Sequence, residues 1–369
     1  MKNKSTIKTL SNQYYRIENA GGKVWLIPVK YQRNGLCLYQ PSGWRGKLLK
    51  VLLPYFHLIP AVRKLAHVEV CNYELPENLR NMICGVIDKE EFIFSVFLGT
   101  PCTHQKTTIQ IFDRSGIICY CKVTDSDEIA RLFYDEKEIL DYLQKKGVDG
   151  VPRCLFCGKI EESGYAFVQS TSKTFSSHVL HDWSMLHEDF LNELYGKTGR
   201  DVLFEDSDYY KSLLELRSHL DWLPNDDARK VVRVAVEGVI EQYVGKNVKY
   251  CVCHADFTPW NMSVEKGKLF VFDWEYAQKT YPPFLDKYHY FTQTAIFESH
   301  WSEKEILKYI ESADGKWIDK NTYCMYLLDI ISRYTLREKG NIGKDLECCF
   351  RIWLKLLSVC ETPCMFSSF

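Results

Sequence analysis

The sequence predicts an α+β chain whose first half holds antiparallel β-strands and whose second half is mostly helical. Between residues 92 and 123, short apolar runs alternate with tight turns, which is typical of neighbouring strands. From about residue 184 onward, apolar positions recur at spacings of three and four, which indicates helices with one buried face. Two further strand-like runs, Val248–Cys253 and Lys268–Phe272, interrupt the helices, and we expect them to be neighbouring strands joined by a loop.

Composition and length limit the classes of protein to consider. The chain has 369 residues, enough for two lobes or two to three domains, each with its own core. Its formal net charge of -1 does not indicate a nucleic-acid partner. The sequence contains no apolar run long enough to form a membrane-spanning helix.

Cysteine usage indicates a reducing compartment. The chain has 15 cysteines, and its first residues, MKNKSTIKTLSNQ, contain no apolar signal segment. We therefore expect a cytoplasmic protein with free thiols. Cys154-x-x-Cys157 has metal-like spacing, but no second Cys or His pair matches it, so free cysteines are expected there as well.

Residues 1–85 are predicted to form an N-terminal extension of unknown role. Apolar runs at 24–29 and 36–39 alternate with turn-forming residues, which suggests a small β element. A basic amphipathic segment follows at 44–66, interrupted by Pro54 and Pro60. We favour a helical element docked on the protein through its apolar face, and the alternative is peripheral contact with a membrane surface.

Residues 86–170 are predicted to form a β-rich lobe. A helix over 126–147 follows the first three strands, because its apolar residues recur at helical spacing and Ser126 or Asp127 can cap its start. The expected strands are 92–100, 106–113, 117–123, 155–160 and 164–170.

Residues 171–369 are predicted to form a mostly helical lobe. The expected helices are 184–195, 208–220, 226–243, 303–312, 323–339 and 344–359.

The most informative motif is HADFTPWNM, which starts at His254 and is followed after nine residues by FDWE. It places Asp256, Asn261 and Asp273 on two turns that each follow a short apolar run. One carboxylate can then face a hydroxyl group, while an amide oxygen and a second carboxylate surround Mg²⁺. Phosphoryl transfer from ATP needs this set, because its catalysis consists mainly of positioning and charge neutralisation.

This segment resembles the HxDxxxxN motif of the aminoglycoside phosphotransferase/choline kinase family, the small-molecule branch of the protein-kinase-like fold. The resemblance covers roughly residues 90 to 360 and implies two lobes, an antiparallel β N-lobe and a mostly helical C-lobe. It also implies that Asp256 is the catalytic base, that Asn261 is a metal ligand and that Asp273 bridges Mg²⁺ and the phosphates.

The same resemblance assigns nucleotide-binding roles in the N-lobe. Lys122, at the end of a predicted strand, matches the lysine that holds the α- and β-phosphates, with Glu136 as its ion-pair partner and Glu138 as the rival. The loop at Gly99 and Thr100 is not a GxGxxG loop but can still offer N–H groups and hydroxyls to phosphate oxygens. Main-chain atoms of Val168 to Ser170 are expected at the adenine.

Further residues near the motif receive secondary roles. His254 is expected to be structural, and the resemblance implies that Asp286 ties down the catalytic segment. Glu275 could reach the substrate or a second metal, or brace the loop. Nearby aromatic rings could stack on a sugar or enclose a cation, although core packing is expected for any single one. These rings are Trp260, Trp274, Tyr276, Tyr281, Tyr288 and Tyr290.

The predicted function is a kinase that uses ATP and Mg²⁺ to phosphorylate a hydroxyl group of a small molecule, with no nucleic-acid partner. A sugar or glycan intermediate and an amino alcohol such as choline are the expected acceptor classes. An aminoglycoside-modifying phosphotransferase and a catalytically silent, kinase-like scaffold are the alternatives. The sequence indicates no oligomeric state.

Overall fold

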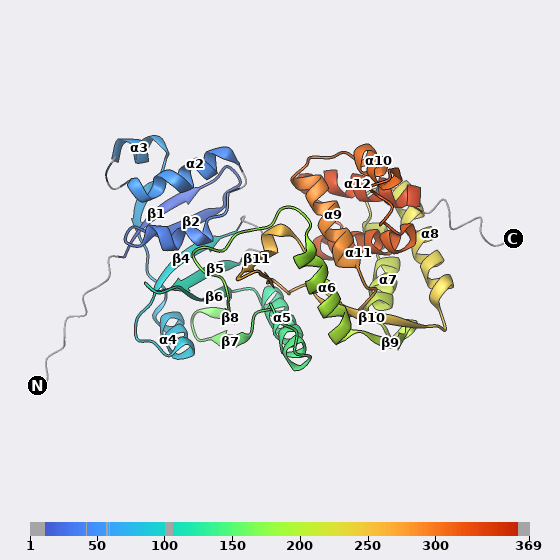
Figure 1. Cartoon of the computed structure of the whole chain (residues 1–369), viewed down its shortest axis with the longest axis horizontal. Coiled ribbons are helices and arrows are strands. Elements are labelled where there is room, and N and C mark those ends of the chain that lie inside the picture. The colour runs from blue at the N-terminus through green and yellow to red at the C-terminus, as the bar shows by residue number, and fades with distance from the viewer. Residues whose placement is uncertain (1–11, 42, 57, 59, 100–105, 361–369) are drawn as a thin grey trace, which may run out of the picture. The chain divides into compact units, whose positions relative to one another are not determined.

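The computed structural model describes residues 12–41, 43–56, 58, 60–99 and 106–360, apart from the side chains of residues 60, 62, 344 and 345. These residues form two compact units (Figure 1). The sheet unit comprises residues 1–141 and 152–178, and the helical unit comprises residues 142–151 and 179–369. No helix among the described residues is both long enough and apolar enough to cross a bilayer.

One antiparallel sheet of eight strands organises the sheet unit, with the order β3-β1-β2-β4-β5-β6-β8-β7. The strands are β1 Gln13–Glu18, β2 Val24–Pro28, β3 Glu69–Asn72, β4 Ile93–Leu98, β5 Thr107–Phe112, β6 Ile117–Thr124, β7 Cys154–Ile160 and β8 Gly164–Ser170. The five strands predicted within 86–170 are therefore present, as β4 to β8.

The strands of the N-terminal extension continue the sheet of the predicted N-lobe. Strand β2 pairs with β4, with Val24 opposite Leu98 and Trp25 opposite Phe97. All five residues of β2 are buried, so this strand needs cover on both faces and a neighbour on both edges. We expected a domain boundary near residue 85, but the hydrogen bonds between β2 and β4 join residues on its two sides into one sheet.

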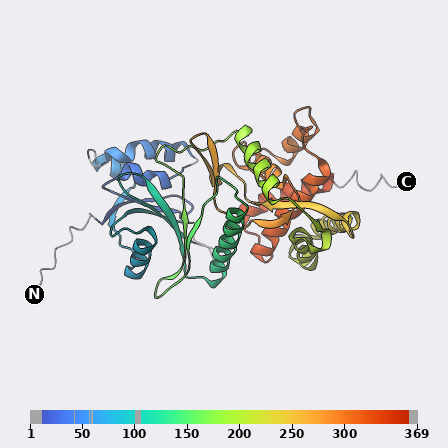
Figure 2. The ribbon, with the colours of Figure 1, turned by 60° about the horizontal axis from the view of Figure 1, so that its bottom comes forward.

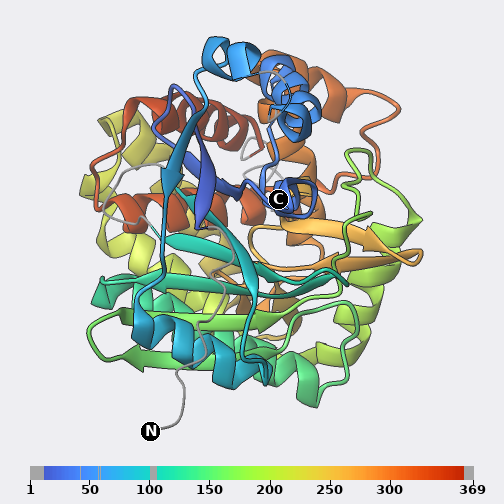
Figure 3. The same ribbon diagram turned by 90° about the vertical axis from the view of Figure 1, so that its left-hand side faces the viewer.

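Five helices among the described residues pack on this sheet. They are α1 Gln32–Gly35, α2 Trp44–Leu52, α3 Pro60–Leu65, α4 Glu77–Ile87 and α5 Asp127–Lys145. Side chains alternate along β2, because successive residues of a strand point to opposite faces. Trp25 and Ile27 join a core with Leu53 and Phe56, which directly follow α2, whereas Val24 and Leu26 join a core with Leu79 and Ile83 of α4. Figure 3 shows α2 and α4 on opposite sides of the sheet.

Helix α5 lies beside the strands at the other end of the sheet (Figure 2). The rings of Phe133 on α5 and Phe167 on β8 have centroids 5.9 Å apart. The helix matches the predicted 126–147 segment closely, because its apolar residues recur at helical spacing over five turns.

The helical unit contains seven α-helices among the described residues, and six of them contribute side chains to one large hydrophobic core. They are α6 Met185–Thr198, α7 Asp208–Ser218, α8 Asp226–Tyr243, α9 Leu285–Phe297, α10 Glu303–Glu311, α11 Lys320–Glu338 and α12 Lys344–Cys360. Two small sheets accompany them: β9 Arg200–Leu203, β10 Asn247–Cys253 and β13 Gln278–Tyr281 form one, and β11 Met262–Glu265 and β12 Lys268–Val271 form the other.

The prediction that Val248–Cys253 and Lys268–Phe272 are neighbouring strands was wrong. Strand β10 pairs with β9 and β13, whereas β12 pairs with β11. Lys266 and Gly267 join β11 to β12, both with left-handed backbone angles (φ 50° and 75°), so a two-residue hairpin turn supplies β12 with a closer partner. Lys-Gly is not one of the dipeptides that strongly indicate a hairpin, and β11 was therefore not predicted from the sequence.

Helix α9 was not predicted. Eight of its thirteen residues are buried, so apolar and polar residues do not separate onto two faces. Asp286, His289 and Gln293 are among the buried residues, which removes the periodic signal that identifies a helix at the surface of a core.

The continuity of the sheet predicts that the extension contributes to the stability of the whole unit. Ile27 is fully buried in β2. We expect Ile27→Ala to lower the free energy of unfolding of the sheet unit by about 3 kcal/mol, through lost apolar contacts and the cavity left behind. Urea titration followed by tryptophan fluorescence, with each transition fitted separately, measures this change.

Val51→Ala is the matched control, because Val51 is 65% exposed in the same region of the chain. It should change the free energy of unfolding by less than about 0.5 kcal/mol. Equal effects of the two substitutions would show that the extension does not share the core of the sheet.

Candidate active site

A buried ion pair lies in the sheet unit between β6 and α5. Lys122 and Cys121 point to opposite faces of the sheet, and Cys121 joins the core under α4. The ammonium nitrogen of Lys122 lies 2.7 Å from a carboxylate oxygen of Glu136, and these side chains are 5% and 0% exposed. The rival carboxylate, Glu138, is exposed on the same helix. The structure therefore brings Lys122 together with Glu136.

The environment of the pair holds the lysine side chain in place. The Lys122 ammonium also lies 5.6 Å from the ring centre of Phe167, which is its cross-strand neighbour on β8. Burying a charge is costly unless an opposite charge lies close to it, so loss of either member of the pair would destabilise the fold. Lys122 is therefore fixed at one point of the sheet face.

The other nucleotide-binding residues predicted in this unit have different surroundings. Gly99 directly follows β4, and Thr100 lies outside the described residues. Val168 is fully buried in β8, between Cys121 and Phe156 of the neighbouring strands. The main-chain N–H of Ser170 donates to the carbonyl of Arg153, and its hydroxyl accepts from the N–H of Arg153. Adenine binding by these residues stays a prediction.

In the helical unit, Asp286 holds the segment that follows β10. Its two carboxylate oxygens accept hydrogen bonds from the main-chain N–H groups of His254 (2.8 Å) and Ala255 (2.9 Å). The thiol of Cys253 lies 3.3 Å from the same carboxylate. Asp286 is 4% exposed and occupies the first turn of α9, where the helix dipole favours a negative charge. It ties the loop down, as the resemblance implies for this position.

The loop turns at Ala255, which has the left-handed φ of 66°. This conformation costs an alanine about 1–2 kcal/mol, so the surroundings must impose it. The N–H of Ala255 donates to Asp286, and its carbonyl accepts from the guanidinium of Arg333, which also pairs with Asp329. Side chains from two helices, α9 and α11, thus bind both main-chain polar groups of Ala255.

The His254 side chain forms hydrogen bonds with both turns of the motif. Its Nδ1 accepts from the N–H of Asp256 at 3.2 Å, so its Nε2 carries the proton and donates to the carbonyl of Phe272 at 3.1 Å. Burial lowers the pKa of His254, which favours this neutral form. His254 therefore links the two turns of the motif and acts as a positioning residue.

Asp256 is held by donors on both carboxylate oxygens. The side-chain amide of Asn261 donates to Oδ2 at 2.7 Å and to the Asp256 carbonyl at 3.0 Å. Nε2 of His289 lies 3.1 Å from Oδ1, and because an ionised carboxylate only accepts, His289 is the donor. The Asp256 side chain remains 26% exposed, so a substrate hydroxyl can reach the lone pairs that these bonds leave open.

Sequence reasoning missed His289. Its side chain is 2% exposed, and its Nδ1 has no hydrogen-bond partner in the described structure. It follows Asp286 by three residues, so both lie on one face of α9. The sequence signal that could have identified His289 is its spacing of three residues from Asp286. This spacing places the two side chains on one face only if the segment is a helix, and α9 was not predicted.

Asp273 begins the second turn of the motif, also with a left-handed φ of 70°. Directly before it, the N–H of Phe272 donates to the carbonyl of Asn261 at 3.0 Å, which connects the two turns. Directly after it, Trp274 is fully buried, donates to the carbonyl of Val271 and packs edge-on against His254. Asp273 and Glu275 are both partly exposed on this turn.

A close approach of the main chain secures β12, which leads into Asp273. The carbonyl of Gly150 accepts from the N–H of Val271 at 2.8 Å. Gly150 has a φ of 69°, and a Cβ atom there would meet the carbonyl oxygen of Leu269 at 2.4 Å. Only glycine fits this position.

The aromatic residues near the motif mostly pack in the core. Trp274, Tyr281, Tyr288 and Tyr290 are all buried, and Tyr276 is partly buried. Trp260 differs, because it is 44% exposed and meets the half-exposed Phe297 edge-on at 6.2 Å. Trp260 immediately precedes Asn261, so one exposed aromatic pair stands next to the candidate site.

The Cys154-x-x-Cys157 pair has the properties of ordinary thiols. Burial raises the pKa of Cys154 to about 12 and that of Cys157 to about 11. At neutral pH, pKa values this high leave both cysteines as neutral thiols when no metal is bound. Among the residues that the structure describes, no group of metal-ligating side chains includes either cysteine.

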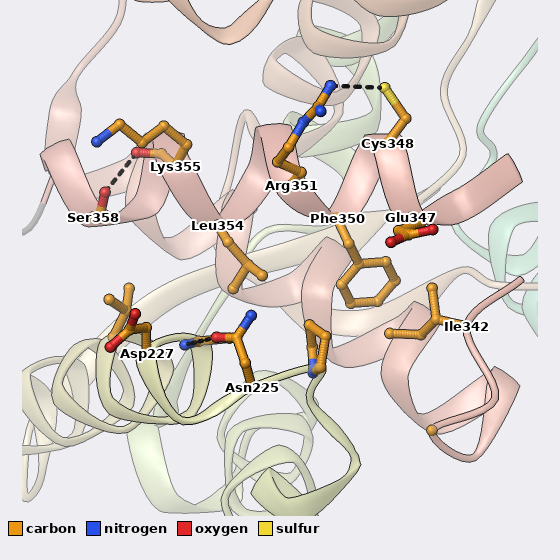
Figure 4. Close-up of a pocket in the computed structure, with 14 residues that line it drawn as sticks. Asn225, Asp227, Ile342, Glu347, Cys348, Phe350, Arg351, Leu354, Lys355 and Ser358 are labelled. Carbon is orange, nitrogen blue, oxygen red and sulfur yellow. Dashed lines mark hydrogen bonds between the residues drawn. The ribbon is translucent and has the colours of Figure 1, made fainter. Parts of the chain in front are cut away.

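A groove of about 1060 Å³ lies elsewhere in the helical unit, between α8 and α12 (Figure 4). Phe350 and Leu354 line its floor, and Asn225 at its edge caps α8 by accepting from the N–H of Ala228. None of the residues predicted for the active site lines this groove.

Comparison with solved structures identifies the fold. Choline kinase LicA from Streptococcus pneumoniae matches 76% of this chain and 98% of its own length, with a TM-score of 0.50 and 16% sequence identity. The chain has a two-lobed, protein-kinase-like fold. This confirms, at the level of the fold, the resemblance to the aminoglycoside phosphotransferase/choline kinase family.

Aminoglycoside phosphotransferase APH(4)-Ia, in a ternary complex with ADP and hygromycin B, matches 79% of this chain and 99% of its own, with a TM-score of 0.49 and 11% identity. No protein-family model and no curated protein sequence matches the chain.

The buried ion pair predicts unequal effects of two neighbouring substitutions. Glu136→Gln removes the carboxylate that lies 2.7 Å from the buried ammonium of Lys122, and we expect the free energy of unfolding of the sheet unit to fall by about 3 kcal/mol. Glu138→Gln, on the exposed side of the same helix, should change it by less than about 0.5 kcal/mol. Urea titration of both variants provides the measurement, and a larger effect at Glu138 would contradict the pairing.

Proposed function

We propose that the protein is an ATP-dependent kinase that phosphorylates a hydroxyl group of a small molecule. The observation that supports this most directly is the arrangement around Asp256. Its carboxylate is partly exposed, is oriented by donors on both oxygens, and shares one loop with Asn261. Held in this way, it suits the task of receiving a proton from a hydroxyl that attacks phosphorus.

In the proposed reaction, the substrate oxygen forms a bond to the γ-phosphorus of ATP. The bond between that phosphorus and the β,γ-bridging oxygen breaks, and ADP leaves with the electron pair. The hydroxyl proton passes to the carboxylate of Asp256. Because a free carboxylate is a weak base, orientation of the hydroxyl for in-line attack is the larger part of this contribution.

Asn261 and Asp273 suit the metal that such a reaction uses. The amide nitrogen of Asn261 is engaged by Asp256, which leaves the amide oxygen as the atom for a hard cation. Asp273 contributes a carboxylate on the adjoining turn, which the hydrogen bond between Phe272 and Asn261 connects to the loop. Mg²⁺ bound to these oxygens would neutralise charge on the phosphates.

Lys122 is proposed to bind the α- and β-phosphates, with Glu136 fixing its position. The ammonium group carries three hydrogen-bond donors, of which the carboxylate of Glu136 takes one at 2.7 Å. The buried pair keeps the lysine in one rotamer, so little conformational entropy would be lost when phosphate binds. Gly99, which directly follows β4, is proposed to contact the phosphates through its main-chain atoms.

For the acceptor, we propose a sugar or glycan intermediate or an amino alcohol. The exposed pair of Trp260 and Phe297 supports this class, because aromatic rings pack against sugar faces and attract organic cations. The solved structures that share the fold include a choline kinase and an aminoglycoside phosphotransferase with hygromycin B. Their acceptors therefore belong in the first substrate panel, together with free sugars.

Asp256→Asn tests the mechanism. The amide cannot accept the hydroxyl proton, so we expect kcat to fall by roughly 10²–10⁴-fold while ATP still binds. Turnover is measured as ADP release with Mg²⁺ against the sugar, amino-alcohol and aminoglycoside panel, and ATP binding as a thermal shift. Asp227→Asn serves as the control, because Asp227 is an exposed carboxylate on α8 outside the site.

Two outcomes would overturn the proposal. Equal turnover by the wild type and Asp256→Asn would remove Asp256 from the mechanism. Failure of the wild type to bind ATP with Mg²⁺ would instead favour the catalytically silent scaffold.

His289 offers a sharper test of how Asp256 is positioned. His289→Phe keeps the ring but removes the donor to Oδ1, and we expect kcat to fall about tenfold with KM for ATP unchanged. His289→Gln can place an amide donor near the position of Nε2 and should recover part of the loss. If both variants lost activity equally, or if only KM changed, His289 would have a packing role alone.

A further inference from the structure

Helix α2 and the turn after it carry two apolar stripes instead of one. Leu49, Leu53 and Phe56 follow helical spacing and pack against β1 and β2 in the core of the sheet unit. A second stripe, Trp44, Leu48, Val51 and Tyr55, follows the same spacing and is exposed. Docking on the sheet explains the first stripe and leaves the second without a packing role.

We call the second stripe, together with Leu58 and Leu65, the outer face. The exposed fractions are 71% for Trp44, 51% for Leu48, 65% for Val51, 67% for Leu58 and 80% for Leu65, with Tyr55 at 46%. Single exposed apolar residues are ordinary on protein surfaces, but six large ones within one short segment mark an interaction site. In Figure 1, α2 and α3 lie next to each other at the edge of the sheet unit.

The charged residues in the stretch of chain that carries the outer face all have one sign. Between residues 19 and 68 the chain has eight lysines and arginines and no aspartate or glutamate. Arg45, Lys47 and Lys64 are exposed beside the stripe, and the guanidinium of Arg45 lies 5.4 Å from the ring centre of Trp44. The chain as a whole has a net charge of -1, so this segment concentrates positive charge that the rest of the protein offsets.

This combination fits the surface of an anionic lipid bilayer. Tryptophan, tyrosine and leucine side chains enter the boundary between headgroups and acyl chains, while flanking lysines and arginines reach the lipid phosphates. A nucleic acid would use the positive charge but not the leucines. Helix α2 has nine residues, so it would lie in the plane of the interface and not cross it.

We propose that the outer face binds the protein peripherally to anionic membranes. This inference does not depend on the proposed kinase activity, because every residue that it uses lies in the N-terminal extension, outside the candidate active site. It identifies a role for part of the N-terminal extension, which has no role in the proposed chemistry.

Vesicle co-sedimentation of the full chain tests the proposal. We expect binding to vesicles of phosphatidylcholine with 30% phosphatidylglycerol that is at least tenfold tighter than to pure phosphatidylcholine. Raising NaCl from 0.1 to 0.5 M should weaken it, because salt screens the lysine and arginine contacts. Leu48→Glu and Arg45→Glu/Lys47→Glu should each reduce binding at least tenfold, the first through the apolar stripe and the second through the charge.

Val244→Glu is the matched control, because Val244 is 50% exposed in the helical unit, and it should bind as the wild type does. All variants change exposed residues, so unchanged thermal unfolding confirms that each is folded. As a second readout, anionic vesicles should shift tryptophan emission of the wild type to the blue, and Trp44→Phe should reduce that shift.

Three results would overturn the proposal. The first is the absence of vesicle binding at 1 mM lipid, and the second is equal binding of Leu48→Glu and wild type. The third is a wild-type dimer that Leu48→Glu converts to a monomer, which would assign the outer face to a second copy of the chain.

Discussion

The hydrogen bonds from His254 and Ala255 to the carboxylate of Asp286 are the constraint on which the candidate active site depends. They hold Ala255 in a left-handed conformation that alanine does not adopt by preference. The direction of the chain after Ala255 then places Asp256 against both Asn261 and His289. Without Asp286, two buried N–H groups would lose their acceptor, and the left-handed turn at Ala255 would lose the hydrogen bonds that stabilise it from this side.

The sheet unit depends on a different constraint, the two-sided burial of β2. Because this strand pairs with β4, the N-terminal extension and the predicted N-lobe form one sheet with continuous cores on both faces. The helix that covers one of those faces also presents a second apolar stripe outward. The extension therefore stabilises the lobe and, at the same time, displays a surface that the kinase chemistry does not require.

Sequence reasoning predicted the strands β4 to β8 and most of the helices, because their hydrophobic periodicity is local. It failed where burial was nearly complete or where an uncommon turn sequence concealed a strand pairing. Helix α9 has buried polar residues and shows no apolar stripe, so it was missed, and His289 was missed with it. Strands β10 and β12 were expected to be neighbours, but a hairpin with an uncommon Lys-Gly turn gave β12 another partner. Thr100 lies outside the described residues.

The sequence by itself determined which chemical groups are available and in what order: a carboxylate and an amide after one strand, a second carboxylate after another, and a lysine followed by a helix with two candidate glutamates. Only the tertiary structure decided which of these groups meet. Glu136 is buried against Lys122 whereas Glu138 is exposed, and His289 reaches Asp256 from 33 residues away. The physical reason is that local spacing fixes the face on which a side chain lies, whereas packing between distant segments fixes what that face touches.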